Sequence, residues 1–239
     1  MIPKRIHYCW FGGNSIPVSA QKCIESWHQH MPDWEYMLWN EDSFDISLYP
    51  YAREAYEARK FAFVSDVARL YALKEYGGVY LDTDVLVYKS FDPLLDYPAF
   101  AGFEGSKHCP VGTCVMASEA GGAWVSKQLA DYEGRRFIKE DGSFDLTTNV
   151  TFITRKMVDG GFVANGQEQD FDGLHVFPMD YFSPRHTTGE YIRTDRTYCE
   201  HLGLASWGEN GGGWKSRLLS KLGPSVRVSI IKMKRKLFG

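Results

Sequence analysis

The chain has 239 residues, enough for one large domain or two small ones, and its 44% hydrophobic and 24% charged content is typical of a soluble globular protein. Its five cysteines are odd in number and lack C-x-x-C spacing, which argues against a disulfide framework or a zinc motif. Residues 215–239 hold eight of the 27 Lys and Arg and no acid, so the first 214 residues carry 19 basic and 30 acidic groups. A body with a net charge of −11 should not bind nucleic acid.

Strands and helices alternate along the first half of the chain. In chain order we expect a strand at 5–11, a helix at 17–30, a strand at 35–39, a helix at 54–76 with a break near Lys60, strands at 79–81, 84–88, 99–103 and 111–117, and helices near 122–133 and 146–157. Short strands and loops should follow to about residue 207. This order predicts an α/β fold with a largely parallel sheet, whose ligand crevice lies at the carboxyl ends of the strands.

The C-terminal part differs from the body in composition. A glycine-rich hinge at 208–213 predicts a domain at 1–212 and a basic amphipathic tail at 213–239. The apolar residues of the tail follow a helical spacing, at Leu219, Leu222, Val226, Ile230, Met233 and Leu237. Either a helix on an anionic membrane surface or a helix docked on the body fits this pattern. The chain begins directly with a strand and has no apolar run of about 18 residues, so we expect a cytoplasmic location.

Two acids one residue apart, Asp82 and Asp84, follow an apolar run that reads as a buried strand. Alternate residues of an extended chain point the same way, so both carboxylates should face one side. Paired hard oxygen ligands suit Mn²⁺ or Mg²⁺, especially with phosphate completing the coordination. Trp10 also falls at the end of a predicted strand, which favours one shared site. Solvated acids in a turn are the simpler alternative.

A third acid, Asp66, lies on a predicted helix that is apolar on nearly every side. Asp66 and Arg69 stand three residues apart and share a helix face. Burying them is costly unless they pair with each other or meet a ligand. They are either a structural ion pair or a pair that holds sugar hydroxyls, for which a carboxylate acceptor and a guanidinium donor are well shaped.

Three segments together resemble a known family. The run 63–85 (Phe-Val-Ser-Asp-Val-Ala-Arg-Leu-Tyr through Gly-Gly-Val-Tyr-Leu-Asp-Thr-Asp-Val) resembles the sugar-nucleotide-binding region of DXD glycosyltransferases. The strand at 2–13 and the late segment 200–207 (Glu-His-Leu-Gly-Leu-Ala-Ser-Trp) resemble the same group. It is the family of the yeast initiating α-mannosyltransferase and bacterial capsular polysaccharide transferases, distantly related to clostridial glucosylating toxins. The resemblance covers residues 2 to 207 and implies a GT-A fold.

The resemblance also implies roles for individual residues. The implied catalytic residues are Asp66, Arg69, Asp82 and Asn149. The implied donor-binding residues are Ile6, His7, Trp10, Tyr80, Asp82, Ser206 and Trp207. The implied metal ligands, for Mn²⁺ or Mg²⁺, are Asp84, His201 and Ser206. In this scheme Trp10 stacks on the base, the backbone near Ile6 and His7 reads the edge of the base, and Trp207 contacts the diphosphate. The segment 147–150 departs from the family pattern, so Asn149 is only a candidate on the acceptor side.

The implied activity is metal-dependent, retaining transfer of a hexose from a nucleotide-sugar, with UDP-sugars as first candidates. The acceptor would be a saccharide, including a lipid-linked one at the cytoplasmic membrane face, in cell-surface polysaccharide synthesis.

Two alternatives to this activity remain. The segment 81–85 also fits the D-x-D-x-[TV] loop of haloacid-dehalogenase-like phosphatases, with Asp82 as nucleophile, although that motif normally sits in the first strand. The second alternative is a non-catalytic module that binds a sugar or a nucleotide.

Overall fold

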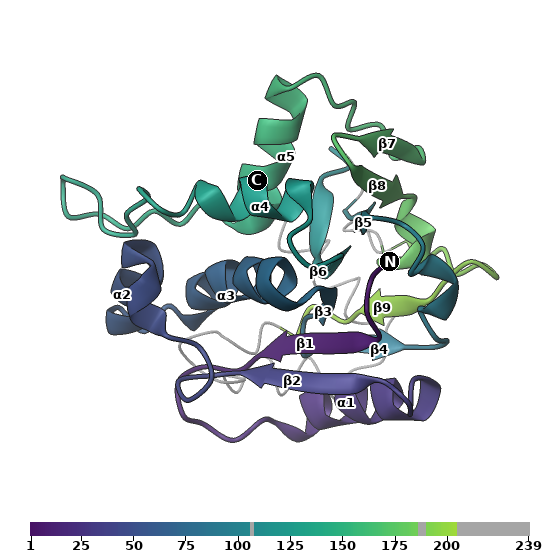
Figure 1. Ribbon diagram of the computed structural model, residues 1–239. Coiled ribbons are helices and arrows are strands. Elements are labelled where there is room, and N and C mark those ends of the chain that lie inside the picture. The colour runs from purple at the N-terminus through teal and green to yellow at the C-terminus, as the bar shows by residue number, and fades with distance from the viewer. Residues whose placement is uncertain (106–107, 186–189, 205–239) are drawn as a thin grey trace, which may run out of the picture. The chain divides into compact units, whose positions relative to one another are not determined.

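The computed structural model describes residues 1–105, 108–185 and 190–204 (Figure 1). The predicted tail at 213–239, together with Ser206 and Trp207, lies outside the described residues. The predicted domain boundary at residue 212 is therefore still a prediction. Within the described part, no helix is long and apolar enough to cross a membrane.

A seven-stranded sheet forms the centre of the fold. Its strands, in spatial order, are β2 (Glu35–Trp39), β1 (Arg5–Cys9), β3 (Gly78–Leu81), β6 (Val111–Ser118), β5 (Ala99–Phe103), β8 (Leu174–Phe177) and β7 (Gln169–Phe171). Only β6 and β7 run opposite to the other five, since β6 is antiparallel to β3 and β5, and β7 is antiparallel to β8. The prediction of an α/β fold with a largely parallel sheet is confirmed. A second, two-stranded antiparallel sheet pairs β4 (Val85–Val87) with β9 (Cys199–His201).

Five α-helices accompany these strands within the described residues: α1 (Val18–His30), α2 (Pro50–Glu57), α3 (Phe61–Tyr76), α4 (Ala123–Ala130) and α5 (Asn149–Asp159). Short 3-10 turns occur at Ile46–Leu48, Asp92–Leu94 and Met179–Tyr181. Each predicted helix and each predicted strand is present, with ends shifted by a few residues and the expected break at Lys60 between α2 and α3.

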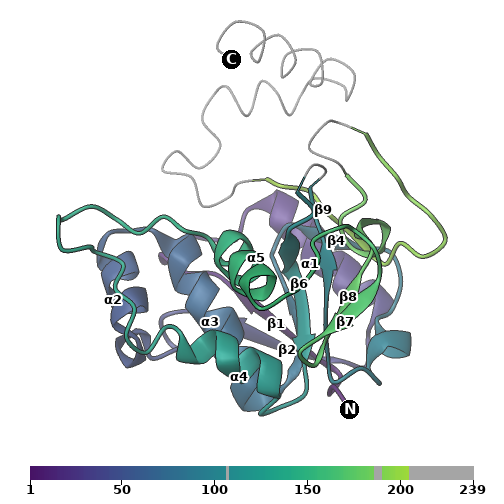
Figure 2. The ribbon, with the colours of Figure 1, turned by 90° about the horizontal axis from the view of Figure 1, so that it is seen from above.

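Helices α1 and α3 lie on opposite faces of the sheet, as the alternating side chains of β1 show. Tyr8 points toward α1, where its ring centroid lies 5.5 Å from that of Trp27. His7 points the other way, with its ring 6.3 Å from that of Tyr76 at the end of α3. Because successive strand residues face opposite sides, each face of β1 has its own helix. In Figures 1 and 2, α3 lies against one face of the central strands.

The two glycines after α3 set the start of β3. Gly77 and Gly78 have positive φ angles of 62° and 125°. A Cβ at Gly78 would lie 2.6 Å from the Arg5 carbonyl oxygen, so a side chain there would push β3 away from β1. The pair therefore ends the helix and lets the chain enter the sheet at once. As a result, β3 delivers residues 82–84 to the same sheet edge as the end of β1.

Candidate functional site

The two acids of the DXD motif lie in a tight turn rather than in an extended strand. Asp82 follows β3, and its backbone N–H donates to the Cys114 carbonyl over 2.9 Å. Val85 N–H then donates back to the Asp82 carbonyl over 3.0 Å, closing the turn before β4. One oxygen of each carboxylate lies within 4.8 Å of the other, as predicted, but the segment between them is a turn and not an extended strand. Thr83, between them, is buried.

His201 is brought to this turn by the small second sheet. Val85 pairs with His201 in the β4–β9 register, and Leu202 N–H donates to the Asp84 carbonyl over 3.0 Å. The His201 Nε2 atom lies 3.3 Å from Asp84 Oδ1. One ligand atom each from Asp82, Asp84 and His201 lie within 4.8 Å of one another. Two carboxylates and an imidazole at this spacing fit a hard divalent cation such as Mn²⁺ or Mg²⁺.

The protonation of His201 follows from its neighbours. Burial alone lowers the pKa of His201, but the nearby Cys114 sulfur and Asp84 carboxylate raise it by more, to about 12. The imidazolium therefore supplies the positive charge that Asp84 needs when no other cation is present. A divalent ion at the same point would take over that role, with His201 then binding it as a neutral ring.

Arg69 joins two of the three carboxylates that the sequence singled out. Its Nη2 atom lies 3.2 Å from Asp66 Oδ1 and 3.3 Å from Asp82 Oδ1. Its Nη1 donates to the Thr113 carbonyl over 2.7 Å, and its guanidinium lies 4.5 Å from the centre of the Tyr80 ring. Burial lowers the pKa of Arg69, but Tyr80, Asp82 and Asp66 raise it by more, so the charge is permanent. A buried cation between two acids fixes both of them in place.

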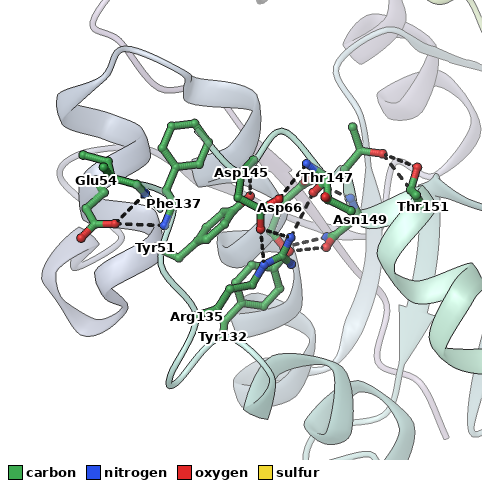
Figure 3. Close-up of polar contacts among 12 residues, drawn as sticks. Tyr51, Glu54, Asp66, Tyr132, Arg135, Phe137, Asp145, Thr147, Asn149 and Thr151 are labelled. Carbon is green, nitrogen blue, oxygen red and sulfur yellow. Dashed lines mark hydrogen bonds and ion pairs between the residues drawn. The ribbon is translucent and has the colours of Figure 1, made fainter. Parts of the chain in front are cut away.

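Asp66 also reaches the N-terminus of α5. Asn149 is the first residue of that helix; its backbone N–H donates to Asp66 Oδ2 over 3.1 Å, and its side chain donates to the Asp66 carbonyl over 2.8 Å. Tyr132 O–H donates to Asn149 Oδ1 over 2.6 Å. Figure 3 shows these side chains converging with Arg135, which pairs with Asp145. Burial raises the pKa of Asp66 to about 6, although Arg69 opposes that shift.

The end of β1 corrects one prediction. Ile6 and His7 are fully buried, and β1 is paired with β2 on one side and β3 on the other. His7 Nε2 bonds the Gly77 carbonyl over 2.8 Å, while its Nδ1 accepts from Trp39 over 3.0 Å. The backbone at these two residues is thus enclosed in the sheet and cannot read the edge of a base. Trp10, one residue past β1, is half-buried and donates to the Asn14 carbonyl over 2.7 Å.

Tyr80 supports the site from within the core. Its side chain is buried, and its O–H donates to Asp82 Oδ1 over 2.9 Å. Tyr80 therefore positions Asp82 rather than facing a ligand. The roles predicted for Ser206 and Trp207 lie outside the described residues and stay predictions.

Sequence reasoning missed one acid at this edge of the sheet. Glu104 follows β5 directly, as Asp82 follows β3, and the two strands run in the same direction. One ligand atom each from Glu104, Cys114 and His201 lie within 4.8 Å of one another. An acid directly after a predicted strand was the available signal for Glu104. Cys114 carried none, because it stands in the middle of β6.

Comparison with known proteins agrees with the geometry. Residues 17–101 match the family described as "Glycosyltransferase sugar-binding region containing DXD motif". The chain is 42% identical over 106 residues to inositol phosphoceramide mannosyltransferase 3 of Schizosaccharomyces pombe, a match that covers 41% of this chain and 29% of that protein. It is 26% identical over 218 residues to glycosyltransferase L373 of Acanthamoeba polyphaga mimivirus, covering 87% and 84% of the two chains. The PaToxG glycosyltransferase structure superposes with a TM-score of 0.49 at 18% identity, over 66% of this chain and 72% of that one.

Residues 17–101 are thus similar to the sugar-binding region of DXD-containing glycosyltransferases, and the chain has relatives among the fungal mannosyltransferases. Its matched segment spans under a third of the length of the fission yeast relative.

Proposed function

We propose that this protein is a divalent-metal-dependent, retaining glycosyltransferase that moves a hexose from a nucleoside-diphosphate sugar to a saccharide acceptor. The observation that carries this proposal is the convergence of Asp82, Asp84 and His201 beside the Asp66–Arg69 pair. UDP-linked hexoses are the first donors to consider. GDP-mannose is the second, because the fission yeast relative is named a mannosyltransferase.

The charges at this site explain the need for a cation. A diphosphate placed 4 Å from the Asp84 carboxylate would meet a repulsion of about 4 kcal/mol per pair of unit charges at an effective dielectric near 20. Asp84 and His201 would hold Mn²⁺ or Mg²⁺, with Asp82 beside them. A bound divalent ion supplies the positive charge that neutralises the diphosphate and stabilises the departing nucleoside diphosphate.

The remaining side chains would hold the sugar. Arg69 holds Asp66 and Asp82 at a fixed separation. Both carboxylates can accept hydrogen bonds from the hydroxyls of the donor sugar. Trp10 offers a partly exposed indole past the end of β1 for the base. Asn149 tethers Asp66 to α5 and thereby couples the donor side to the segment we assign to the acceptor. Same-face attack by the acceptor accounts for retention without a dedicated nucleophile.

The acceptor and setting are also part of the proposal. We assign the chain to cell-surface polysaccharide synthesis at the cytoplasmic membrane face, with a lipid-linked saccharide as acceptor. The support is the name of the fission yeast relative, an enzyme of a ceramide lipid, and the eight cations of residues 215–239. If truncation after Gly213 left cosedimentation with anionic vesicles unchanged, the membrane part of the proposal would fail.

Donor hydrolysis is the direct test of the activity. Purified protein incubated with Mn²⁺ and single nucleotide-sugars should release nucleoside diphosphate from one of them, and EDTA should stop the release. Binding of a nucleotide-sugar without release over hours would instead identify a binding module. Turnover of p-nitrophenyl phosphate with no donor hydrolysis would identify the phosphatase alternative.

A further inference from the structure

We propose that Glu104, Cys114 and His201 form a second metal site, selective for thiophilic ions such as Zn²⁺, which shares His201 with the DXD site. The inference depends on these three side chains and not on transferase activity. Its consequence for catalysis, inhibition by zinc, rests on the proposed function.

The three ligands come from separate elements that the fold brings together. Glu104 follows β5, Cys114 lies on β6, and His201 is the last residue of β9. Glu104 N–H donates to the Pro110 carbonyl over 2.9 Å, which continues the β5–β6 ladder past its last registered pair and holds the acid beside β6. One ligand atom from each residue lies within 4.8 Å of the other two. Ligand atoms of a tetrahedral zinc ion lie roughly 3.3–3.8 Å apart. The three side chains therefore need to move only a small distance toward one another to bind zinc.

Gly112 makes room for the carboxylate. It stands two residues before Cys114 on β6, so both positions face the same side of the sheet. A Cβ at Gly112 would lie 2.8 Å from Glu104 Oε2. Gly112 has no positive φ, so its backbone does not require glycine. Its lack of a side chain serves to let Glu104 lie over β6 near the Cys114 sulfur.

The donor set differs in kind from that of the DXD turn. Thiolate, imidazole and carboxylate together are a ligand set for zinc, whereas two carboxylates and an imidazole suit Mn²⁺ or Mg²⁺. Cys114 is buried, while Glu104 and His201 are partly exposed and provide an entry path. Three protein ligands leave the fourth zinc position for water.

Sharing His201 makes the two sites antagonistic. The ring has a nitrogen 3.3 Å from Asp84 Oδ1 and a ligand atom within 4.8 Å of the Cys114 sulfur. An ion on the Cys114 side would draw the ring away from Asp84, and two dications this close would repel each other. Zinc should therefore weaken Mn²⁺ binding at Asp82 and Asp84 without occupying those carboxylates.

The test is metal binding by the full chain. Competition with a chromophoric chelator measures the zinc affinity. The near-ultraviolet absorbance band of a cobalt–thiolate bond, after Co²⁺ is added in place of zinc, reports whether a cysteine is a ligand. Cys114→Ser should remove the cobalt band and lower zinc affinity at least tenfold, and Glu104→Gln should lower zinc affinity. Asp84→Asn should keep both the cobalt–thiolate band and the zinc affinity. Cys109→Ser, which alters a cysteine outside the triad, is the matched control and should change nothing.

Gly112→Ala provides an independent variant that retains every ligand. It should lower zinc affinity by displacing the Glu104 carboxylate, and it keeps the test available if Cys114→Ser fails to fold. A cobalt–thiolate band that survives Cys114→Ser, or that is lost in Cys109→Ser, would overturn the proposal. Zinc binding in a protein that hydrolyses no nucleotide-sugar would support the site and count only against the proposed function.

Discussion

The two aspartates of the DXD turn are separated by a single residue but face different cations. Asp82 faces the buried guanidinium of Arg69 at 3.3 Å and accepts a hydrogen bond from Tyr80. Asp84 faces His201 at 3.3 Å, a partly exposed ring on the small second sheet. One carboxylate is thus fixed by a permanent charge within the core. The other has an exchangeable partner, which a metal ion can replace.

This difference divides the site into a structural half and a functional half. Arg69, Tyr80 and Asp66 are all buried, so changes there should be felt in folding as well as in donor binding. Asp84 is buried as well, but its partner His201 is partly exposed, so a change at this pair should remove metal affinity at a smaller cost to stability. Variants on either side test whether the division is real.

The largest expected effect is on turnover in Asp84→Ala. Losing the proposed metal ligand should reduce metal-dependent donor hydrolysis on the order of 10⁴-fold, because the charge of the leaving group would no longer be neutralised. Steady-state rates at saturating Mn²⁺ measure this. Asp159→Ala, at the exposed end of α5, is the matched control and should keep wild-type rates. Wild-type turnover by the Asp84 variant would remove the metal from the account.

The next effect is on stability in Arg69→Met. Removing the shared cation leaves the buried Asp66 and the Asp82 carboxylate without their partner, which should lower the free energy of unfolding by about 3–5 kcal/mol. Urea denaturation measures the loss. Arg155→Met changes an exposed arginine on another helix and should cost little. If both variants were equally stable, Arg69 would not be the structural cation described here.

The smallest effect concerns His7, whose role the structure revised from ligand contact to core support. Burial lowers the pKa of His7 to about 4, from an ordinary value of 6.5. The unfolded chain binds a proton as pH falls through 6.5 while the folded chain resists until about pH 4, so stability is lost in that window. Between pH 7 and 5 the wild type should lose about 2 kcal/mol more than His7→Gln. Urea melts at both pH values measure this difference, with His30→Gln as an exposed control; parallel losses in wild type and His7→Gln would contradict the assignment.

Some of the site was predictable because its cause is local. Asp66 and Arg69 share a helix face at a spacing of three, and Gly77 with Gly78 marks where α3 must end. Trp10 and Asp82 each follow a predicted strand directly, which is a local signal; the β1–β3 pairing then brings both to one edge of the sheet.

Other contacts depend on pairings that no local pattern encodes. Asp84 and His201 meet only through the β4–β9 register, so from sequence the contact rested on family resemblance. Cys114 reaches His201 from mid-strand, where its side chain reads as core. The burial of His7 was missed because β1 is paired on both sides, a property of sheet order and not of the strand itself.

The central claim is that a divalent ion held at the DXD turn neutralises the negative charge of the donor diphosphate. Calorimetric titration of UDP and GDP into the wild type and Asp84→Ala, each with Mn²⁺ and with EDTA, tests it most directly. We expect one nucleotide to bind the wild type at least tenfold more tightly with Mn²⁺ than with EDTA, and Asp84→Ala to lose that difference. Nucleotide binding that is equally tight in EDTA, or a metal effect that survives in Asp84→Ala, would contradict the account.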